Sequence, residues 1–185
     1  MEDQTQSGTR FRILTLLDEF TRQCLALHAA WSIRAVDAIT VIEAAIARYG
    51  APQHLRSNNG PEFIACAIQD WFRERQIKTL YIKPGSPWEN GHIESFHDKL
   101  RDECLDRELF GTLAEARIIL KSWRVEYNEK RPHSALGYQT PGEFATRSNF
   151  GLLPVRQLPD LLPPKLAKRT NYQNLIKRKP AELHL

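Results

Sequence analysis

The chain has 185 residues, 42% of them hydrophobic and 26% charged, which is typical of a globular domain with one sizeable core. Its apolar runs fall short of the roughly 20 residues that a membrane span requires, and its first residues lack the basic and apolar regions of a signal peptide. We therefore expect a cytoplasmic protein without a membrane segment.

The net charge of +4 is unevenly distributed. Residues 1–150 hold 19 Lys/Arg and 20 Asp/Glu, whereas residues 151–185 hold 7 Lys/Arg and 2 Asp/Glu. Such a basic tail could lie along phosphates or could be a solvated end, and both alternatives remain open. The three cysteines, Cys24, Cys66 and Cys104, are an odd number without close pairing, so we expect small buried thiols in a reducing compartment.

The first half of the chain predicts two strands, a helix and a third strand. Residues 11–17 and 24–31 are short apolar runs joined by a polar link, which is typical of a hairpin. Apolar residues recur at helical spacing over 34–49, and Gly50 and Pro52 end that helix. Residues 54–57 form a short strand that ends at Asn58.

The second half continues the alternation. Pro61 opens a helix that runs to about residue 75, and residues 77–82 form a strand. A helix over residues 90–108 and another from the capping box at Thr112 to just before Pro132 follow. Beyond the core, assigned to residues 1–146, residues 147–185 predict a proline-rich, then basic and poorly ordered tail. This order predicts an α/β fold with a mixed sheet and helices on its faces.

Glu94 and Asn58 are the candidate site residues. Glu94 falls in the first turn of a predicted helix, where the helix dipole favours a carboxylate. Considered alone, Glu94 is more simply interpreted as a solvated surface glutamate. Asn58 follows a strand, at the edge where clefts of such sheets lie, but an asparagine also suits an ordinary turn.

Basic and aromatic residues provide candidate contacts to DNA. The predicted set is Lys83, Trp88, Arg101, Lys168 and Arg169. A plain surface loop explains the first two equally well. We expect a structural role for His133 after the last helix, and a surface ion-pair cluster at Asp18, Glu19 and Arg22.

Four motifs occur in order along the chain. They are Asp18-Glu19-Phe20-Thr21-Arg22, Arg56-Ser57-Asn58-Asn59-Gly60-Pro61-Glu62-Phe63, Trp88-Glu89-Asn90-Gly91-His92-Ile93-Glu94-Ser95-Phe96 and the segment from Tyr127 to Tyr138. Together they resemble bacterial insertion-sequence transposases with a retroviral-integrase-like catalytic core, over about residues 3–146. The resemblance implies a ribonuclease-H-like fold, an Asp-Asp-Glu triad, and two Mg²⁺ or Mn²⁺ ions that promote phosphodiester strand transfer.

Mapped onto this chain, Glu94 matches the glutamate of the triad and Asn58 stands where the second aspartate belongs. The resemblance places the first aspartate on the first, central strand, in a Trp-x-x-Asp-Phe context shortly before Asp3, so most of that strand is expected to be missing. An amide brings no charge to a metal site, and Mg²⁺ prefers carboxylates. We therefore expect metal binding to be impaired, and a gap in the sheet that exposes unpaired backbone groups.

These expectations leave three functional hypotheses. The first is an integrase-type core for DNA integration and transposition that lacks activity by itself. The second is a non-catalytic DNA-binding or oligomerising partner of a full-length transposase or of further copies of the chain, and the basic tail motivates it. The third is a metal-dependent nuclease that uses Glu94 with Glu62 or Asp70, although Asp70 falls on the helix after Asn58 with no positional reason to reach the cleft.

Overall fold

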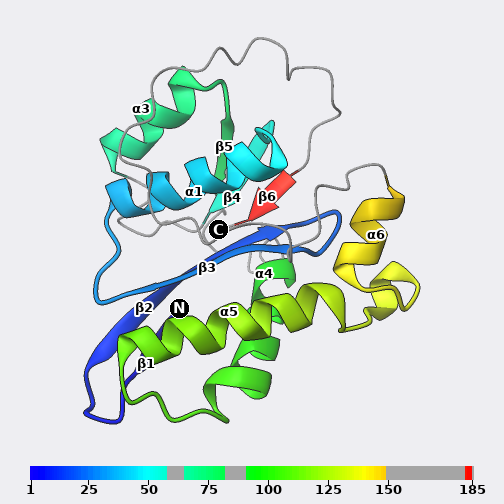
Figure 1. The fold of residues 1–185 in the computed structure, drawn as a ribbon. Helices are drawn as coiled ribbons and strands as arrows, with labels where there is room; N and C mark the ends of the chain where they lie inside the picture. Colours follow the sequence, from blue (N-terminus) through cyan, green and yellow to red (C-terminus); the bar gives the residue numbers. More distant parts are fainter. Residues whose placement is uncertain (58–64, 82–90, 149–181, 185) are drawn as a thin grey trace.

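The computed structural model describes residues 1–57, 65–81, 91–148 and 182–184, and Figure 1 shows them as a sheet with helices on both faces. The strands are β1 (Glu2–Gln4), β2 (Arg10–Asp18), β3 (Cys24–Ala30), β4 (His54–Ser57), β5 (Lys78–Tyr81) and β6 (Glu182–His184). The helices are α1 (Ala35–Tyr49), α3 (Cys66–Glu74), α4 (Gly91–Leu100), the π-helical turn η2 (Arg101–Leu105), α5 (Leu113–Glu129), the 3₁₀ turn η3 (Ser134–Leu136) and α6 (Pro141–Arg147).

Strand β2 divides the core between the two faces of the sheet. It pairs antiparallel with β3, from Arg12 opposite Ala30 to Leu17 opposite Cys24. Because successive side chains of a strand point to opposite faces, Phe11 and Leu17 pack with α4 and α5, whereas Leu16 packs with α1 and α3. The sheet is therefore buried on both faces, as the near-continuous apolar run of β2 requires.

Two helical layers cover the sheet. Helices α1 and α3 lie on one side, with Ile42, Ile68 and Phe72 buried between them and the strands (Figure 1). On the other side α5 crosses β3, and α4 lies behind it. Among the described residues, no helix has the length and apolar composition needed to cross a bilayer.

The sequence predicts most of these elements, and the structure corrects several of them. The helix predicted over residues 90–108 is α4 followed by η2, where the amide of Asp106 donates to the carbonyl of Arg101 in the i to i+5 pattern of a π-turn. Helix α6 was not predicted, although Thr140 and Glu143 form a capping box with Pro141 in the first turn. Cys66 is exposed, unlike the buried Cys24 and Cys104.

Strand β6 fills part of the expected gap in the sheet. It lies between β2 and β4, antiparallel to Leu17 and Asp18 and parallel to residues 54–56. Part of the tail that was predicted to be poorly ordered is therefore a strand inside the sheet (Figure 1). Strand β5 closes this half of the sheet by pairing in parallel with β4.

Candidate functional site

The candidate carboxylate, Glu94, lies in the first turn of α4 and is exposed to solvent. Peptide dipoles leave a partial positive charge at that end of a helix, which favours an anionic side chain. The next residue back, Ile93, is buried, so the apolar stripe of α4 faces the core and Glu94 lies beside it. This is where the sequence predicts the glutamate to be.

An aromatic cluster holds the middle of α4. Phe96 is buried and meets Trp123 and Tyr127 of α5 edge-on, at ring-centroid distances of 5.6 and 5.1 Å. Edge-to-face pairs of this kind add about 0.5–1.5 kcal/mol beyond their buried area. The helix that carries Glu94 is thus fixed against α5 two residues further along.

A polar contact joins α4 to the central strand β2. The Nε2 of His97 lies 2.8 Å from the Oγ1 of Thr15, a buried residue of β2. Burial, with the positive charge of the Met1 amine, lowers the pKa of His97 to about 4. The ring is therefore neutral near pH 7, and one hydrogen bond links the helix of Glu94 to the middle of the sheet.

The N-terminal end of α4 lies near the carboxyl end of β4. Burial and the nearby Arg22 and Arg56 lower the pKa of His92, so this part of α4 faces the β2–β3 turn and β4. Arg56 donates from Nε to Glu19 at 3.1 Å, in a partly buried ion pair. Arg56 is two residues before Asn58, and Asn58 itself lies outside the described residues.

The Asp18–Arg22 segment is not the surface ion-pair cluster predicted from the sequence. Asp18 is buried, and its Oδ1 accepts hydrogen bonds from the amides of Phe20 and Thr21. Burial raises the pKa of Asp18 despite those hydrogen bonds. Arg22 adopts a positive φ of 61° in this turn, and Glu19 pairs with Arg56 instead. The segment is a structural turn whose backbone is held by Asp18.

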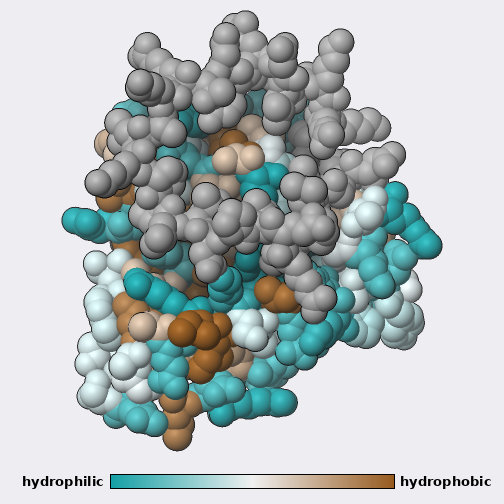
Figure 2. Space-filling model, viewed as in Figure 1, coloured by the Kyte–Doolittle hydropathy of each residue, from teal (hydrophilic) through white to brown (hydrophobic). Residues whose placement is uncertain are grey.

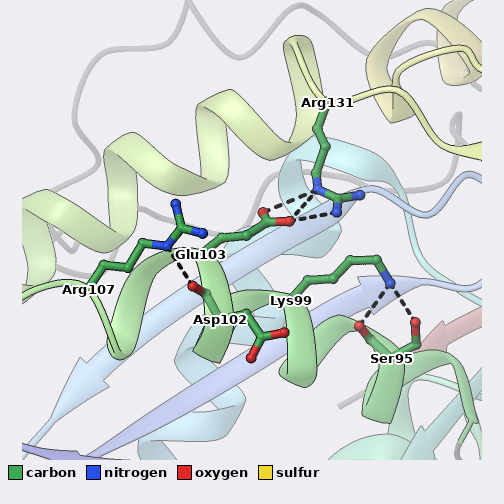
Figure 3. A network of polar contacts seen from close by, with 6 residues as sticks. All are labelled: Ser95, Lys99, Asp102, Glu103, Arg107 and Arg131. Atoms are coloured by element: carbon green, nitrogen blue, oxygen red, sulfur yellow. Dashed lines mark hydrogen bonds and ion pairs between the residues drawn. The ribbon is translucent and has the colours of Figure 1, made fainter.

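The far end of the helix is anchored by a two-pronged ion pair (Figure 3). Arg131, just after α5, donates from Nη2 and Nε to the carboxylate of Glu103 in η2, with N–O distances of 2.6 and 2.8 Å. The Nε of Arg107 donates to the carbonyl of Asp102. The Nζ of Lys99 donates to both the carbonyl and the hydroxyl of Ser95. The pair between Arg131 and Glu103 ties η2 to the end of α5, whereas the other two contacts are local to α4 and η2.

The predicted structural role of His133 agrees with its surroundings. Its amide donates to the carbonyl of Gln139, and its ring meets Tyr127 edge-on at 4.9 Å. Burial and the neighbouring Arg131 lower the pKa of His133 to about 4. The motif from Tyr127 to Tyr138 therefore contributes packing at the end of α5.

Other predicted site residues fall in different places. Arg101 is exposed on η2, and its Nη1 lies 3.6 Å from the Oδ1 of Asp106. Asp70 faces solvent on α3 and pairs with Arg73, away from α4. The remaining predictions, Glu62, Lys83, Trp88, Lys168 and Arg169, lie outside the described residues.

The described residues do not by themselves provide a ligand set for Mg²⁺. Among residues 1–57, 65–81, 91–148 and 182–184, no group of three His, Cys, Asp or Glu side chains could hold a metal ion. Asp3 of β1 lies close enough to raise the pKa of Cys104. Since ten residues separate Cys104 from Glu94, about 15 Å of helix, Asp3 does not meet Glu94. Glu94 remains as one carboxylate of the expected ligands.

Sequence reasoning missed the residue that connects α5 to the start of β3. Asn128 is 1% exposed, and its side chain accepts from the amide of Cys24 and donates to the carbonyl of Cys24, both at 2.9 Å. A polar residue within the apolar stripe of a predicted helix was the available signal. The contact with Thr15 carried no such signal, because 82 residues separate Thr15 from His97.

Comparison with protein-family models gives two matches, both described as an integrase core domain. One matches residues 2–87 and the other matches residues 75–141. Among curated proteins, the chain is 38% identical over 145 residues to an uncharacterised 31.7-kDa protein of insertion element IS407 from Burkholderia multivorans, covering 78% of this chain and 52% of that protein. It is 37% identical to an uncharacterised 39.2-kDa protein of insertion element IS476 from Xanthomonas euvesicatoria, covering 77% and 41%.

A named transposase and solved structures extend these likenesses. The transposase of insertion sequence IS904 from Lactococcus lactis is 31% identical over 91 residues, 49% of this chain and 36% of that protein. The chain thus spans about half or less of these curated relatives. The HTLV-2 integrase catalytic core, solved with magnesium, has a TM-score of 0.59 at 17% identity, over 78% of this chain and 90% of that one. A simian T-cell lymphotropic virus intasome chain has a TM-score of 0.64 at 17% identity, over 92% and 56%. These structures establish the ribonuclease-H-like, integrase-core fold.

Proposed function

The chain belongs to the integrase core domain family, as the catalytic core of an insertion-sequence transposase, and from this premise we propose that it serves DNA transposition without transferring strands by itself. In that family two divalent ions held by three carboxylates supply the chemistry of phosphodiester exchange. This chain contributes Glu94, at the exposed end of an anchored helix. The activity, the DNA substrate and the partners of the whole transposase are part of the proposal.

The ligand set around Glu94 carries the proposal. Asn58 offers an amide oxygen without charge where a carboxylate is expected, and Asp3 lies near Cys104 instead of Glu94. A residue placed opposite Thr15, on a strand paired with β2, would lie on the same face of the sheet as Thr15. Its side chain would therefore point toward His97 and α4. None of the described residues occupies that strand position. A neutral amide in place of a carboxylate ligand, as at Asn58, should reduce metal affinity by at least the about 10–100-fold typical of supporting residues.

Strand transfer measured with purified protein tests this proposal. The chain is incubated with DNA carrying the ends of its own element, in Mg²⁺ or Mn²⁺, and joined products are quantified. We expect the same background from the chain, from Glu94→Gln and from Asn58→Asp, because the described residues offer no group of three ligands that an added acid would complete. Joining well above background that Glu94→Gln abolishes would overturn the proposal.

A second candidate function is a non-catalytic partner that binds DNA and associates with a full-length transposase. The observation that favours it is the charge of residues 151–185, with 7 Lys/Arg against 2 Asp/Glu. Lysine and arginine that neutralise phosphates release counterions, so affinity falls with salt by about 0.9 log unit per log unit of salt for each phosphate contacted.

A charge-neutralised tail tests the second function while leaving β6 in place. Lys168→Gln with Arg169→Gln should weaken DNA binding and reduce the salt slope by about 1–2. The matched control is Arg73→Gln with Arg75→Gln on α3, which changes the net charge equally and should leave the slope unchanged. Equal slopes for the two double variants would exclude the tail as a DNA-binding element.

A further inference from the structure

The outer edge of β3 is lined by side chains of α5. Among the described strands β3 pairs only with β2, so the carbonyls of its second edge need other donors. The Nε of Arg117 donates to the carbonyl of Ala29 at 2.8 Å, and the Nη1 of Arg124 donates to the carbonyl of Leu25 at 3.0 Å. Figure 1 shows β3 between α1 and α5. Two guanidinium groups are thus held at fixed places along this edge.

Helix α1 brings a third arginine near the same edge. Arg48 lies in the last turn of α1, with its guanidinium carbon 4.9 Å from the centre of the Tyr49 ring. Its Nε and Nη2 atoms are buried and donate no hydrogen bond within the described part of the chain. Burial lowers the pKa of Arg48, and the positive charge of Arg124 also lowers it. Arg48 and Arg124 therefore approach one another from two helices closely enough for their charges to repel.

No carboxylate of the described residues offsets this repulsion. The charged groups that act on Arg48 are Tyr49 and Arg124, whereas Asp37, in the first turn of α1, is paired with Arg34. The dipole of α1 favours a cation at the position of Arg48, but it leaves the two buried N–H groups unpaired. A buried guanidinium without hydrogen bonds or a counterion is unfavourable. An anion between the two helices would remove both costs.

We propose that Arg48 and Arg124 bind a backbone phosphate of DNA beside the outer edge of β3. Guanidinium groups present paired N–H donors that match the oxygens of a phosphate. Arg124 uses Nη1 for the carbonyls of β3, which leaves its Nε and Nη2 for a ligand, and Arg48 offers the same two atoms. One phosphate can therefore accept hydrogen bonds from both residues, and its negative charge offsets their repulsion.

The rest of this surface favours a nucleic acid over a free phosphate. Arg117, Lys121 and Arg124 are spaced at i, i+4 and i+7, which places them on one side of α5. The carbonyls that accept from Arg117 and Arg124 are four residues apart, about 13 Å along β3. Because phosphates of one DNA strand recur about every 3.4 Å along the helix axis, a single strand spans this distance with about four phosphates.

The exposed side chains of the same face agree with a polyanionic ligand. Trp31, the first residue after β3, is 52% exposed, and an exposed aromatic ring beside basic groups is suited to stacking on a base. In Figure 2, hydrophobic residues form separate spots among hydrophilic ones on the described part of this face. Such a surface favours a charged ligand over an apolar partner.

This inference rests on the proposed function only for the choice of DNA as the source of the phosphate. The unpaired donors of Arg48 point to an anion whichever function the chain has. The tests below measure DNA binding and thermal unfolding without any strand transfer. A failure of the proposed function in the strand-transfer experiment is therefore distinguishable from a failure of this site.

The substitution Arg48→Gln tests the phosphate contact. The full chain and the variant are titrated into a labelled DNA duplex at several salt concentrations, and fluorescence anisotropy is recorded. We expect the variant to bind about 3- to 10-fold more weakly and the slope of log affinity against log salt to fall by about 1. Arg48→Lys keeps the charge and loses the planar fork, so it should keep the slope and lose part of the affinity.

Arg73→Gln is the matched control for the DNA titration. It removes the same charge from an exposed residue of α3, which pairs with Asp70, and it should bind DNA like the parent chain. All variants retain residues 151–185, so the basic tail contributes equally to each titration. Arg124 is left unchanged, because its hydrogen bonds also cover the edge of β3.

Thermal unfolding in inorganic phosphate isolates the anion site from the rest of the surface. Phosphate replaces chloride at constant ionic strength, and Tm is recorded for the parent, Arg48→Gln and Arg73→Gln. A ligand that binds only the folded state raises Tm, so the parent and Arg73→Gln should gain more than Arg48→Gln. The general stabilisation by phosphate acts on all three chains and is removed by the comparison.

Three outcomes would overturn the proposal. Arg48→Gln with the affinity and salt slope of the parent would exclude a DNA contact at this residue. Equal gains in Tm for all three chains would exclude an anion site. A gain in Tm that requires Arg48, together with DNA binding that does not, would assign the site to a free phosphate or a carboxylate. If Arg48→Gln shows no cooperative unfolding, Arg48→Lys decides, and an affinity equal to that of the parent rejects the contact.

Discussion

The two ends of the helix formed by α4 and η2 differ in what holds them. At the η2 end, Glu103 is clamped by Arg131, and Cys104 and Leu105 are buried. At the α4 end, Glu94 and His92 are exposed to solvent. Between them Phe96 and His97 join the helix to α5 and to β2.

This difference shows how a fold can present a polar side chain without burying it. The packed middle and the clamped far end fix the direction of the helix, so the exposed end needs few contacts of its own. A site residue on a rigid element keeps its geometry better than one on a loop. Variants at three residues of this helix and at Arg131, which clamps its far end, test the division, and the expected effect is largest in the packed middle and smallest at the exposed end.

Phe96→Ala should have the largest effect. It removes a buried ring from contact with Trp123 and Tyr127, and substitutions of this kind cost about 3–5 kcal/mol of unfolding free energy. Urea denaturation measures the loss. Ile118→Ala, which changes a residue that is 70% exposed on α5, serves as the control and should cost less than about 0.5 kcal/mol. If both variants lose similar unfolding free energy, the middle of α4 is not packed against α5 as described.

His97 should make the free energy of unfolding depend on pH. Its pKa is about 4 in the folded chain, whereas an unfolded histidine titrates near 6.5. The unfolded state therefore binds more protons between pH 6.5 and 4, and stability falls as the pH is lowered through this window, by about 1–3 kcal/mol for His97.

Replacing His97 separates its contribution from that of other groups. His133 also has a pKa of about 4 and adds to the same slope, so His97→Gln should reduce the pH dependence without removing it. Asp98 and Arg101 act on His97 in opposite directions. Denaturation curves at pH 7, 5.5 and 4.5 give the slope, and an unchanged slope in His97→Gln would show that the ring does not titrate in this window.

The clamp at the far end should contribute less. Arg131→Ala leaves the half-buried carboxylate of Glu103 without its bidentate partner, and we expect a loss of about 1–2 kcal/mol. Arg131→Lys keeps the charge and loses the planar fork, so it should lose only part of that amount. Thermal unfolding of both variants at low and high salt measures the effect. If Arg131→Lys loses as much stability as Arg131→Ala, the contribution of Arg131 comes from the planar geometry of its guanidinium group and not from its charge.

Glu94→Gln should be nearly neutral. Substitutions at exposed positions usually change stability by less than about 0.5 kcal/mol, and the change from carboxylate to amide preserves the shape. Thermal unfolding next to the wild-type chain gives the comparison. A large loss of stability would mean that Glu94 supports the fold, and a large gain would indicate that its charge is held at an unfavourable position.

The sequence predicts the elements of this fold well where local patterns decide them. Helix α1 and strand β4 were expected at their observed places, because their apolar spacing and end signals are local. The break at η2 was missed because a π-turn changes one hydrogen-bond partner without changing composition. The role of Asp18 was misjudged because its burial depends on how the β2–β3 turn packs, which the charge pattern does not reveal.

The sequence by itself determined the order of the elements, the family and the position of Glu94 at the start of a helix. These follow from periodicity and from motifs carried by neighbouring residues. Only the tertiary structure decided that His97 meets Thr15, that Arg131 clamps Glu103, and that β6 enters the sheet between β2 and β4. Each of these joins segments far apart in the chain, and the need to pair buried backbone and polar groups selects the partner after the chain has folded.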